Sequence, residues 1–271
     1  MLDFIRSNSI IHPDISSWIS DIQLNSLTYY SELYICELKL ALEKKYNTIQ
    51  SKKTVFIDNG SSSILHKIIQ NYNNFYIQNQ DFYLYEELIN FYKKDYKRIK
   101  NDNFLDTIMT INHSCILIFT LINNITGEDF SIDTLIDLAQ KKRNVQFVID
   151  GAYKEYSKLT DYDIYKLSCE SNIHYIGTFS KAYGIPGFRI GYMLSDILLE
   201  IPYSISSISA YSEVESLQNK IHINNLKYII KEHKPCISQI NNTEITNHKI
   251  NLQHEKVKKI KKKLKANFML P

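Results

Sequence analysis

The stretch that most constrains the fold of this chain is residues 173–192, an apolar run followed by a turn and a second, shorter apolar run. The β-branched and aromatic residues of the first run predict a buried strand, and the Gly and Pro residues after it predict a turn. Ser180 and Lys181 stand at the end of that strand, and Arg189 stands at the end of the turn. A hydroxyl, an amine and a guanidinium are thus presented together, a set that suits a phosphate next to a carbonyl group. Such a lysine can form a Schiff base if burial or a neighbouring cation lowers its pKa.

Other short apolar runs predict further strands. Residues 115–122 and 145–149 are almost continuously apolar, which is typical of parallel strands covered on both faces. Shorter runs at residues 54–57 and 75–78 predict two more strands. Because segments with helical spacing alternate with these runs, the pattern predicts an α/β protein with a mostly parallel sheet.

The helices between these strands follow from the spacing of apolar residues. In the first of them, the apolar positions Leu33, Cys36, Leu40 and Leu42 are compatible with an amphipathic helix. The predicted helices cover residues 33–46, residues 64–69, a segment that opens at residues 81–85 and runs to about Tyr96, and the residues after the candidate cap Ser131.

The composition excludes several classes of protein. The chain has 271 residues, of which 44% are hydrophobic, enough for one large α/β domain and a smaller piece. Its 32 basic and 29 acidic residues leave a net charge of +3, which is too balanced to argue for nucleic acid as a partner. No apolar stretch reaches the roughly 20 residues of a membrane span, and residues 1–13 lack the features of a secretion signal. We therefore expect a cytoplasmic protein with no nucleic-acid or membrane partner.

The four cysteines, Cys36, Cys115, Cys169 and Cys236, are far apart and show no CxxC or Cys–His spacing. That pattern favours buried free thiols over metal ligands or disulfides. No metal site is expected.

Two further positions suggest ligand binding at strand ends. The turn Gly60-Ser61-Ser62-Ser63 precedes a predicted helix, whose N-terminal N–H groups form a ready anion site. Asp150 follows a buried strand at its carboxyl end, where open α/β sheets place their ligands. For both positions, a plain helix cap is the structural alternative.

Taken together, these motifs resemble those of the class I and II aminotransferases, which are fold type I pyridoxal-phosphate enzymes, and most of all the histidinol-phosphate aminotransferase group. Ser180-Lys181, with Arg189 and the Gly-Tyr pair after it, matches the family's cofactor-lysine motif. Asp150-Gly-Ala-Tyr153 matches Asp-x-Ala-Tyr. The resemblance continues beyond Tyr192 and fades after the helix that follows.

Three other segments are similar to family motifs but depart from them. The segment 123–127, Asn-Asn-Ile-Thr-Gly, stands where the family has Asn-Asn-Pro-Thr-Gly. Gly60-Ser61 begins a turn in which the family carries two acids that are absent here. Residues 82–85, Phe-Tyr-Leu-Tyr, stand where the family has Phe-x-x-Tyr after a Pro that this chain lacks, and Tyr83 leaves a shift of register open.

The resemblance implies a cofactor, pyridoxal 5′-phosphate, and a role for each matching residue. Lys181 would form a Schiff base with it, and Asp150 would pair with its protonated ring nitrogen. Asn124 and Tyr153 would lie at its phenolate oxygen, and Tyr85 would stack on its ring. The residues implied for its phosphate are Gly60, Ser61, Ser62, Ser180, Arg189 and, from a second subunit, Tyr30. This last role implies a homodimer, although Tyr30 could equally pack the N-terminal arm onto the domain.

The fold that the resemblance implies is a three-layer α/β/α large domain with a mostly parallel mixed sheet, plus a partial small domain. We expect an N-terminal arm over residues 1–35, the cofactor-binding domain over 36–200 and the partial small domain over 201–271. The implied reaction is transamination of an amino acid or an amino-acid-derived phosphate to a keto acceptor. No arginine follows Arg189 to bind a substrate carboxylate, so we expect a truncated or degenerate chain.

Two alternatives remain open at this point. Decarboxylases of amino-acid phosphates share the cofactor motifs, because the bond that breaks depends on how the substrate is held. A non-catalytic protein that keeps the fold is the other alternative, although a pure scaffold has no need of Lys181, Asp150, Asn124 and Arg189 together.

Overall fold

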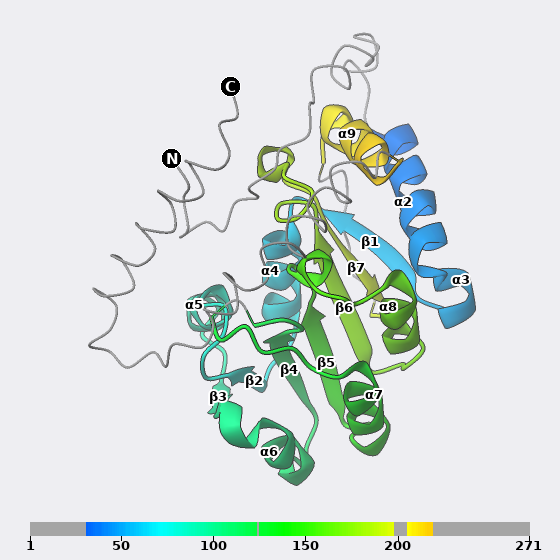
Figure 1. Cartoon of the computed structure of the whole chain (residues 1–271). Coiled ribbons are helices and arrows are strands. Elements are labelled where there is room, and N and C mark those ends of the chain that lie inside the picture. The colour runs from blue at the N-terminus through cyan, green and yellow to red at the C-terminus, as the bar shows by residue number, and fades with distance from the viewer. Residues whose placement is uncertain (1–30, 124, 198–204, 219–271) are drawn as a thin grey trace, which may run out of the picture.

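The computed structural model describes residues 31–123, 125–197 and 205–218, which form a seven-stranded sheet with helices on both faces (Figure 1). The order of strands across the sheet is β1-β7-β6-β5-β4-β2-β3. The strands are β1 (Thr54–Asp58), β2 (Phe75–Gln78), β3 (Tyr96–Ile99), β4 (Cys115–Thr120), β5 (Val145–Asp150), β6 (Ile173–Thr178) and β7 (Gly191–Ser195).

The sheet is mixed, as expected from the sequence. Strands β3, β2, β4, β5 and β6 run parallel to one another, whereas β7 lies between β6 and β1 and is antiparallel to both. The five parallel strands therefore end at one edge of the sheet. Asp150, the last residue of β5, and Lys181, in the turn after β6, lie at that edge.

Helices cover both faces of the sheet, which confirms the predicted three-layer α/β/α class (Figure 1). The longer ones are α2 (Glu32–Tyr46), α4 (Ser61–Asn71), α5 (Leu84–Phe91), α6 (Phe104–Thr110), α7 (Ile132–Lys141), α8 (Asp161–Ser168) and α9 (Ser207–Gln218). Short helical turns complete the described structure: α3 (Thr48–Ser51), η2 (Asn101–Asn103), η3 (Lys154–Tyr156) and η4 (Pro186–Phe188). No helix in the described ranges is both long enough and apolar enough to cross a bilayer.

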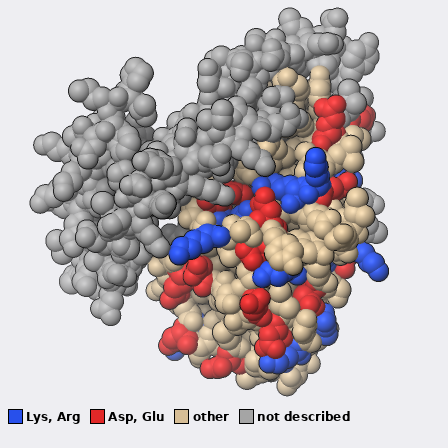
Figure 2. All heavy atoms as spheres, turned by 45° about the vertical axis from the view of Figure 1, so that its right-hand side comes forward, with Lys and Arg blue, Asp and Glu red and all other residues tan. Residues whose placement is uncertain are grey.

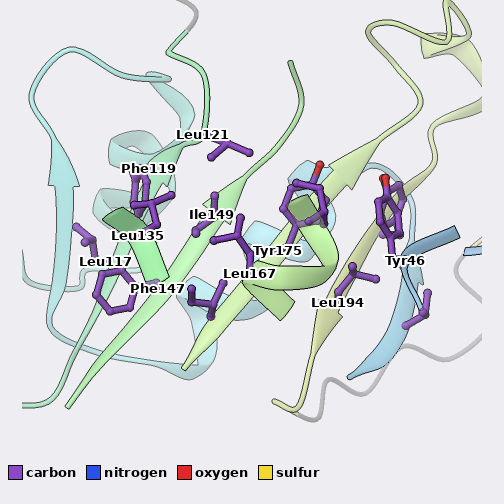
Figure 3. Close-up of a cluster of buried hydrophobic side chains, with 14 of the residues drawn as sticks. Tyr46, Leu117, Phe119, Leu121, Leu135, Phe147, Ile149, Leu167, Tyr175 and Leu194 are labelled. Atoms are coloured by element: carbon purple, nitrogen blue, oxygen red, sulfur yellow. The ribbon is translucent and has the colours of Figure 1, made fainter. Parts of the chain in front are cut away.

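The core divides into two clusters because side chains alternate between the two faces of each strand. On one face, Phe119 and Phe147 pack with residues of α2, α6, α7 and α8 (Figure 3). On the other face, Ile118 and Val148 pack with residues of α4 and α5. Since β4 is buried at every position, its continuous apolar sequence reflects cover on both sides.

Helix α2 confirms the predicted helix but buries a different face. Leu38, Leu42 and Tyr46 point into the core at a spacing of four residues. Leu40 is 64% exposed and Cys36 is also exposed, so the expected apolar face was wrong for these two positions. Tyrosine at position 46 extends the apolar stripe, and a pattern counted only on Leu and Cys misses it.

Three other predictions also needed correction. The helix expected to run to about Tyr96 ends at Phe91, and Tyr96 instead begins strand β3. Ser131 precedes α7 but makes no side-chain capping hydrogen bond. Cys115 is a buried free thiol as expected, whereas Cys169, like Cys36, is exposed.

The predicted division into arm, large domain and partial small domain stays a prediction, and its first boundary, between residues 35 and 36, falls inside α2. The boundary expected near residue 200 lies within 198–204, outside the described residues, as do Cys236 and residues 1–30 of the predicted arm. Residues 54–195 contain every strand of the sheet that the structure describes.

Candidate active site

The polar residues that follow the central strands gather at the carboxyl edge of the sheet. Asp150 is the last residue of β5 and pairs in register with Thr120, the last residue of β4, and with Ile176 of β6. Backbone N–H groups of Leu121 and Gly151 bind across these strand ends. The edge is therefore a rigid platform, and the groups on it are held by strands rather than by loops.

Asp150 is buried, with 3% of its surface exposed. Its carboxylate accepts a hydrogen bond from the hydroxyl of Tyr85 at 3.0 Å and one from the backbone N–H of Ala152 at 2.9 Å. Burial raises the pKa of Asp150, and these two donors together with Lys181 offset the rise only in part. A buried acid whose ionised form is under-compensated is suited to pairing with a cationic group of a ligand.

Lys181 follows β6 and is half-buried. Burial lowers the pKa of its ammonium, Asp150 opposes that change, and the nearby Arg189 adds to it. Its Nζ lies 5.6 Å from the centre of the Tyr153 ring. The structure thus brings Lys181, Asp150 and Tyr153 to one place, and it gives the lysine a lower pKa than a solvated lysine has, as a nucleophilic amine requires.

Arg189 connects the lysine turn to the N-terminus of α4. Its Nη2 donates to the hydroxyl of Ser62 at 3.2 Å, and its Nη1 lies 3.5 Å from the hydroxyl of Ser180. The backbone of Arg189 is left-handed, with φ 55°, which is uncommon for a residue other than glycine. A guanidinium and two hydroxyls at the N-terminus of a helix form a site for an anion such as a phosphate.

Two glycines allow this close approach. Gly60 precedes α4 with φ 82°, and a Cβ on it would lie 2.6 Å from Nη2 of Arg189. A Cβ on Gly191, the first residue of β7, would lie 2.2 Å from the backbone nitrogen of Ser61. Any side chain at either position would displace Arg189 or the turn, so the two glycines keep the anion site open.

The environment of Tyr85 differs from the predicted stacking role. Its side chain is fully buried, and its hydroxyl is used by Asp150. The structure therefore shows Tyr85 as a hydrogen-bond donor beneath the site, and stacking of its ring on a cofactor stays a prediction. The half-buried Phe82 lies edge-on against it, with ring centres 5.5 Å apart.

Two predicted site residues, Tyr30 and Asn124, lie outside the described residues. Asn123, which precedes Asn124 in the sequence, is buried and holds the turn that follows β4. Its Oδ1 accepts from the N–H groups of Ile125 and Thr126, and its Nδ2 donates to the carbonyl of Gln80 at 2.5 Å. The turn after β4 is therefore fastened to the segment that follows β2.

Asp81 and Thr120 also belong to this edge, although the sequence analysis gave them no role. Asp81 is buried and accepts two hydrogen bonds from Thr120, one from its backbone N–H and one from its hydroxyl. Thr120 is the one hydroxyl in the apolar run 115–122, and Asp81 follows the run 75–78 after Asn79 and Gln80, so the sequence carried only a weak signal. Without the strand order, that signal could not show that both residues lie next to Asp150.

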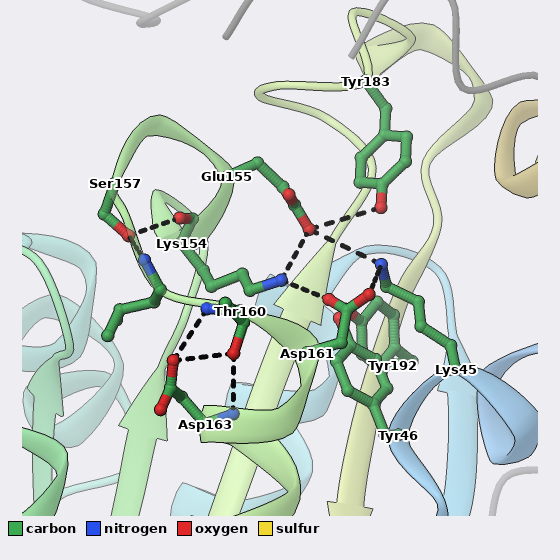
Figure 4. A network of polar contacts seen from close by, with 11 residues as sticks. Lys45, Tyr46, Lys154, Glu155, Ser157, Thr160, Asp161, Asp163, Tyr183 and Tyr192 are labelled. Atoms are coloured by element: carbon green, nitrogen blue, oxygen red, sulfur yellow. Dashed lines mark hydrogen bonds and ion pairs between the residues drawn. The ribbon is translucent and has the colours of Figure 1, made fainter. Parts of the chain in front are cut away.

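A cluster of ion pairs that is buried at Lys154 and Glu155 and more exposed at Asp161 lies next to the lysine turn (Figure 4). We call it the Lys154 network; it consists of Lys45, Lys154, Glu155 and Asp161. Lys154 forms ion pairs with Glu155 at 3.1 Å and with Asp161, and Lys45 pairs with Asp161 at 3.0 Å. Tyr183, two residues after Lys181, lies 3.5 Å from Glu155 and so links the network to the lysine turn.

The described surface carries both signs of charge. Figure 2 shows basic and acidic side chains interspersed over the face in view, rather than a region of one sign. Among the described residues there is no group of three or more His, Cys, Asp or Glu side chains that could hold a metal ion. The anion site at Arg189 is thus a local feature of the carboxyl edge.

The fold is shared with solved aminotransferases. The structure is similar to histidinol-phosphate aminotransferase from Sinorhizobium meliloti in complex with pyridoxal-5′-phosphate, with a TM-score of 0.74 and 19% identity. That match covers 86% of this chain and 69% of the other. It is also similar to L-threonine-O-3-phosphate decarboxylase from Porphyromonas gingivalis, with a TM-score of 0.73 and 17% identity over 87% of this chain and 75% of the other.

Similarity extends to the sequences of curated proteins. Histidinol-phosphate aminotransferase from Sulfurimonas denitrificans is 28% identical over 229 residues, which cover 74% of this chain and 62% of the relative. The enzyme of the same name from Aliarcobacter butzleri is 28% identical over 240 residues, which cover 78% and 63% respectively. The chain thus spans less than two thirds of the length of these relatives.

The family model described as aminotransferase class I and II matches residues 24–240. This range includes the whole sheet and every described residue of the carboxyl edge discussed above. The motifs that suggested the family and the geometry at Lys181, Asp150 and Arg189 agree with that match. The chain belongs to the class I and II aminotransferase family.

Proposed function

We propose that this protein is a pyridoxal-phosphate-dependent aminotransferase of the histidinol-phosphate aminotransferase type, acting on an amino acid or an amino-acid-derived phosphate. The observation that carries the proposal is the joint placement of Lys181, Asp150 and Arg189 at the carboxyl edge of one sheet. The three groups interact electrostatically. Burial lowers the pKa of Lys181, Asp150 opposes that change and Arg189 adds to it.

The residues present fit the cofactor. Arg189, Ser62 and Ser180 form an anion site at the start of α4, and Gly60 and Gly191 keep it free of Cβ atoms. These residues and Ser61 would hold the phosphate, as would Tyr30 from a second subunit. Asp150 would pair with the ring nitrogen, Asn124 and Tyr153 would contact the phenolate oxygen, and Lys181 would bind the aldehyde carbon. When bound, pyridoxal phosphate supplies an aldehyde and an electron-withdrawing ring.

The chain's own groups then have defined tasks. Burial and Arg189 make Lys181 easier to deprotonate, so a larger fraction of its amine is neutral near pH 7 than in a solvated lysine. A neutral amine can act first as a nucleophile and then as the base that moves the proton of the substrate Cα. The Asp150 carboxylate would orient the ring and keep its nitrogen protonated, and Tyr85 holds that carboxylate in place.

The visible absorbance of the protein after addition of pyridoxal phosphate tests the proposal, because covalent attachment to a lysine produces a visible band. We expect the band in the parent and in Lys158→Ala, which alters an exposed lysine of the same region. Lys181→Ala should lack it. An unchanged band in Lys181→Ala would refute the assignment. If the band forms but does not respond to any amino donor, the chain binds the cofactor without transferring an amine.

Decarboxylation of an amino-acid phosphate is the second candidate. It is favoured by the structural similarity to L-threonine-O-3-phosphate decarboxylase, which has nearly the same TM-score as the aminotransferase. Both reactions use the same cofactor site, so only the products separate them. Formation of a keto acid from an amino donor supports transfer, whereas release of carbon dioxide without a keto acid supports decarboxylation.

We further propose that the protein works as a homodimer, with Tyr30 of one subunit contacting the cofactor phosphate of the other. The proposal is supported by the family resemblance, because fold type I enzymes complete their cofactor sites across a two-fold interface. Tyr30→Phe should weaken cofactor retention without unfolding the domain, because it removes one hydroxyl donor and keeps the ring. Sedimentation of a cofactor-loaded monomer, with Tyr30→Phe binding as tightly as the parent, would reject it.

A further inference from the structure

Asp81 is a buried carboxylate that the proposed function does not use. It follows β2 and is 8% exposed. Its Oδ2 accepts from the backbone N–H of Thr120 at 2.9 Å, and its Oδ1 accepts from the Thr120 hydroxyl at 2.7 Å and from the N–H of Phe82 at 2.6 Å. All three donors are neutral, so they fix the position of the carboxylate without balancing its charge.

This arrangement brings a second acid to Asp150. Thr120, which binds Asp81, pairs in register with Asp150 across β4 and β5. The charge of Asp150 reaches Asp81 and opposes its ionisation. Tyr85 interacts with both acids. Burial and the charges of Asp150 and Asp81 raise the pKa of its hydroxyl, which donates a hydrogen bond to Asp150. Among the described residues, Asp150 is therefore the charged group that acts on Asp81, and Tyr85 is a titratable group on which both acids act.

The raised pKa of Asp81 shows that its ionised form is destabilised in the folded chain. Burial raises it to about 6; the Thr120 and Phe82 donors oppose that rise and the charge of Asp150 adds to it. Asp58, at the end of β1, shows the opposite case. It is also buried, but Lys67 lies 2.7 Å away and the pKa of Asp58 is lowered. A buried acid with a structural task has its cation within the chain, whereas Asp81 lacks such a partner among its hydrogen bonds.

We propose that Asp81 is a positioning residue of the cofactor site, a second negative charge that stabilises the cationic ring nitrogen paired with Asp150. This inference rests on the proposed function, since the cation it invokes is the protonated nitrogen of the pyridine ring. Asp81 acts through Asp150 and Thr120 and does not itself contact the ring. The protonated ring nitrogen offsets the repulsion between the two acids. The charge of Asp81 then contributes to the affinity for the cofactor.

The proposal predicts opposite effects of one substitution on stability and on binding. Asp81→Asn keeps the shape and an acceptor for Thr120 but removes the charge. Without cofactor, we expect the variant to be more stable than the parent at pH 7.5, because a costly buried charge is gone. With cofactor, we expect weaker binding by about tenfold, the equivalent of one pKa unit. A residue with only a structural role would not change stability and affinity in opposite directions.

Binding is measured with pyridoxamine phosphate, which carries the same ring and phosphate and forms no bond with Lys181. Affinities are compared at pH 7.5 and at pH 5 for the parent, Asp81→Asn and the control Asp133→Asn, which alters a side chain that is 87% exposed. The affinities of the parent and Asp81→Asn should differ at pH 7.5 and approach each other at pH 5. At pH 5 most of the Asp81 carboxyl groups of the cofactor-free parent are protonated and so are neutral, as the amide of the variant is. Taking the difference between the two proteins removes the titration of the phosphate and of Lys181, which they share, and leaves the effect of Asp81, including its effect on Asp150.

Two results would overturn the inference: equal affinity of the parent and Asp81→Asn at both pH values, or a loss of stability in Asp81→Asn without cofactor. Failure of the proposed function looks different, because the parent itself would then bind neither pyridoxal phosphate nor pyridoxamine phosphate. If the parent binds and only the Asp81 variant behaves unexpectedly, the cofactor site stands and the role of Asp81 falls.

Discussion

Two buried ionic clusters lie a few residues apart in this protein, and they are built on opposite principles. The Lys154 network joins two lysines to two acids. The acidic pair at the carboxyl edge, Asp81 and Asp150, is held by hydroxyl and backbone N–H donors. Only three residues of chain separate Asp150 from Lys154, so the contrast reflects the partners of each group and not its region of the fold.

In the Lys154 network, each acid is compensated from within the chain. Burial by itself raises the pKa of Glu155 and of Asp161, but Lys154 and Lys45 more than reverse the effect, and both pKa values are lowered. Both lysines also lie over the ring of Tyr46, at 5.9 and 5.3 Å from its centre. The network therefore stabilises the ionised forms without any ligand.

At the acidic pair, the balance goes the other way. Burial raises the pKa of both Asp81 and Asp150, and their donors do not reverse it. The comparison teaches how to tell the two kinds of site apart. A buried acid whose pKa is lowered forms an ion pair with a cation of the same chain. A buried acid whose pKa is raised has a charged form that is desolvated without full compensation, which is the pattern of a binding site.

The largest effect should come from breaking the network. Lys154→Met removes a 3% exposed ammonium from two acids, which keep their ion pairs with Lys45. Loss of one partner of a buried ionic cluster costs about 3–5 kcal/mol, and we expect a decrease of this size in the free energy of unfolding from urea titration. As a control, Lys141→Met breaks the exposed pair with Asp137 and should cost about 1 kcal/mol or less. Equal losses in the two variants would contradict the contrast drawn here.

The next effect concerns the acidic pair and has the opposite sign. Folding raises the pKa of Asp81 from 3.8 to about 6, so the folded chain binds this proton more tightly than the unfolded chain. The stabilisation by that proton is full below about pH 4 and is lost as the pH rises through about 6. Relative to the parent, Asp81→Asn should therefore gain on the order of 3 kcal/mol above this window and nothing below it. Urea titrations of the cofactor-free protein at pH 4.5 and 7.5 measure it; a gain that does not depend on pH would point to a cause other than charge.

A smaller effect is expected from Tyr85→Phe, which removes one donor from the buried carboxylate of Asp150 and keeps the aromatic ring. The loss of a hydrogen bond to a charged group should reduce stability by about 1–3 kcal/mol at pH 7. Tyr162→Phe, at a side chain that is 65% exposed, is the control and should change little. Cofactor affinity separates two roles of Tyr85. If ring stacking dominates, Tyr85→Phe binds as tightly as the parent, and if support of Asp150 dominates, it binds more weakly.

The smallest predicted effect tests local sequence signals rather than the clusters. Thr160 and Asp163 form a reciprocal capping box at the start of α8, the helix that carries Asp161. Thr160→Ala should cost ~1 kcal/mol, because it leaves an N-terminal N–H group without its acceptor. Ser131→Ala, before α7, should cost only a few tenths of that, since Ser131 makes no capping hydrogen bond. Thermal unfolding of both variants side by side measures the difference; equal shifts would show that cap geometry does not matter here.

Much of the fold could be predicted from the sequence because the central strands are buried on both faces. The strands ending at Thr120, Asp150 and Thr178 are mostly apolar, with Gln146 and His174 as the interior polar exceptions, and each forms where the sequence predicted a strand. Strand β3 was missed because it lies at the edge of the sheet, where Lys97 and Arg98 are exposed and the apolar signal is weak. A continuous helix was therefore predicted where the chain turns after Phe91.

The candidate site was predictable only where one motif carries several groups. Lys181 and Arg189 lie in one short segment, and their proximity followed from that spacing. The partners of Asp150 lie far away in the sequence, and their convergence depends on the strand order. Asp81 could therefore be placed next to Asp150 only once β2, β4 and β5 were known to be neighbours. The resemblance assigned Tyr85 to the same cofactor as Asp150, but the hydrogen bond between the two was not predicted.

The position of β7 has a consequence for how the chain assembles. In the described sheet β1 pairs only with β7, and Thr54 lies opposite Ser195 in that pair. Strand β1 can therefore join the sheet only after β7, much later in the sequence, is available. Such long-range pairing closes slowly, and a chain still emerging from the ribosome would hold β1 and the glycine turn after it without their strand partner. The parallel strands can form earlier, whereas the anion site between Gly60 and Arg189 is completed only when β7 inserts. Competence to bind a phosphate should therefore be among the last properties the chain gains during folding.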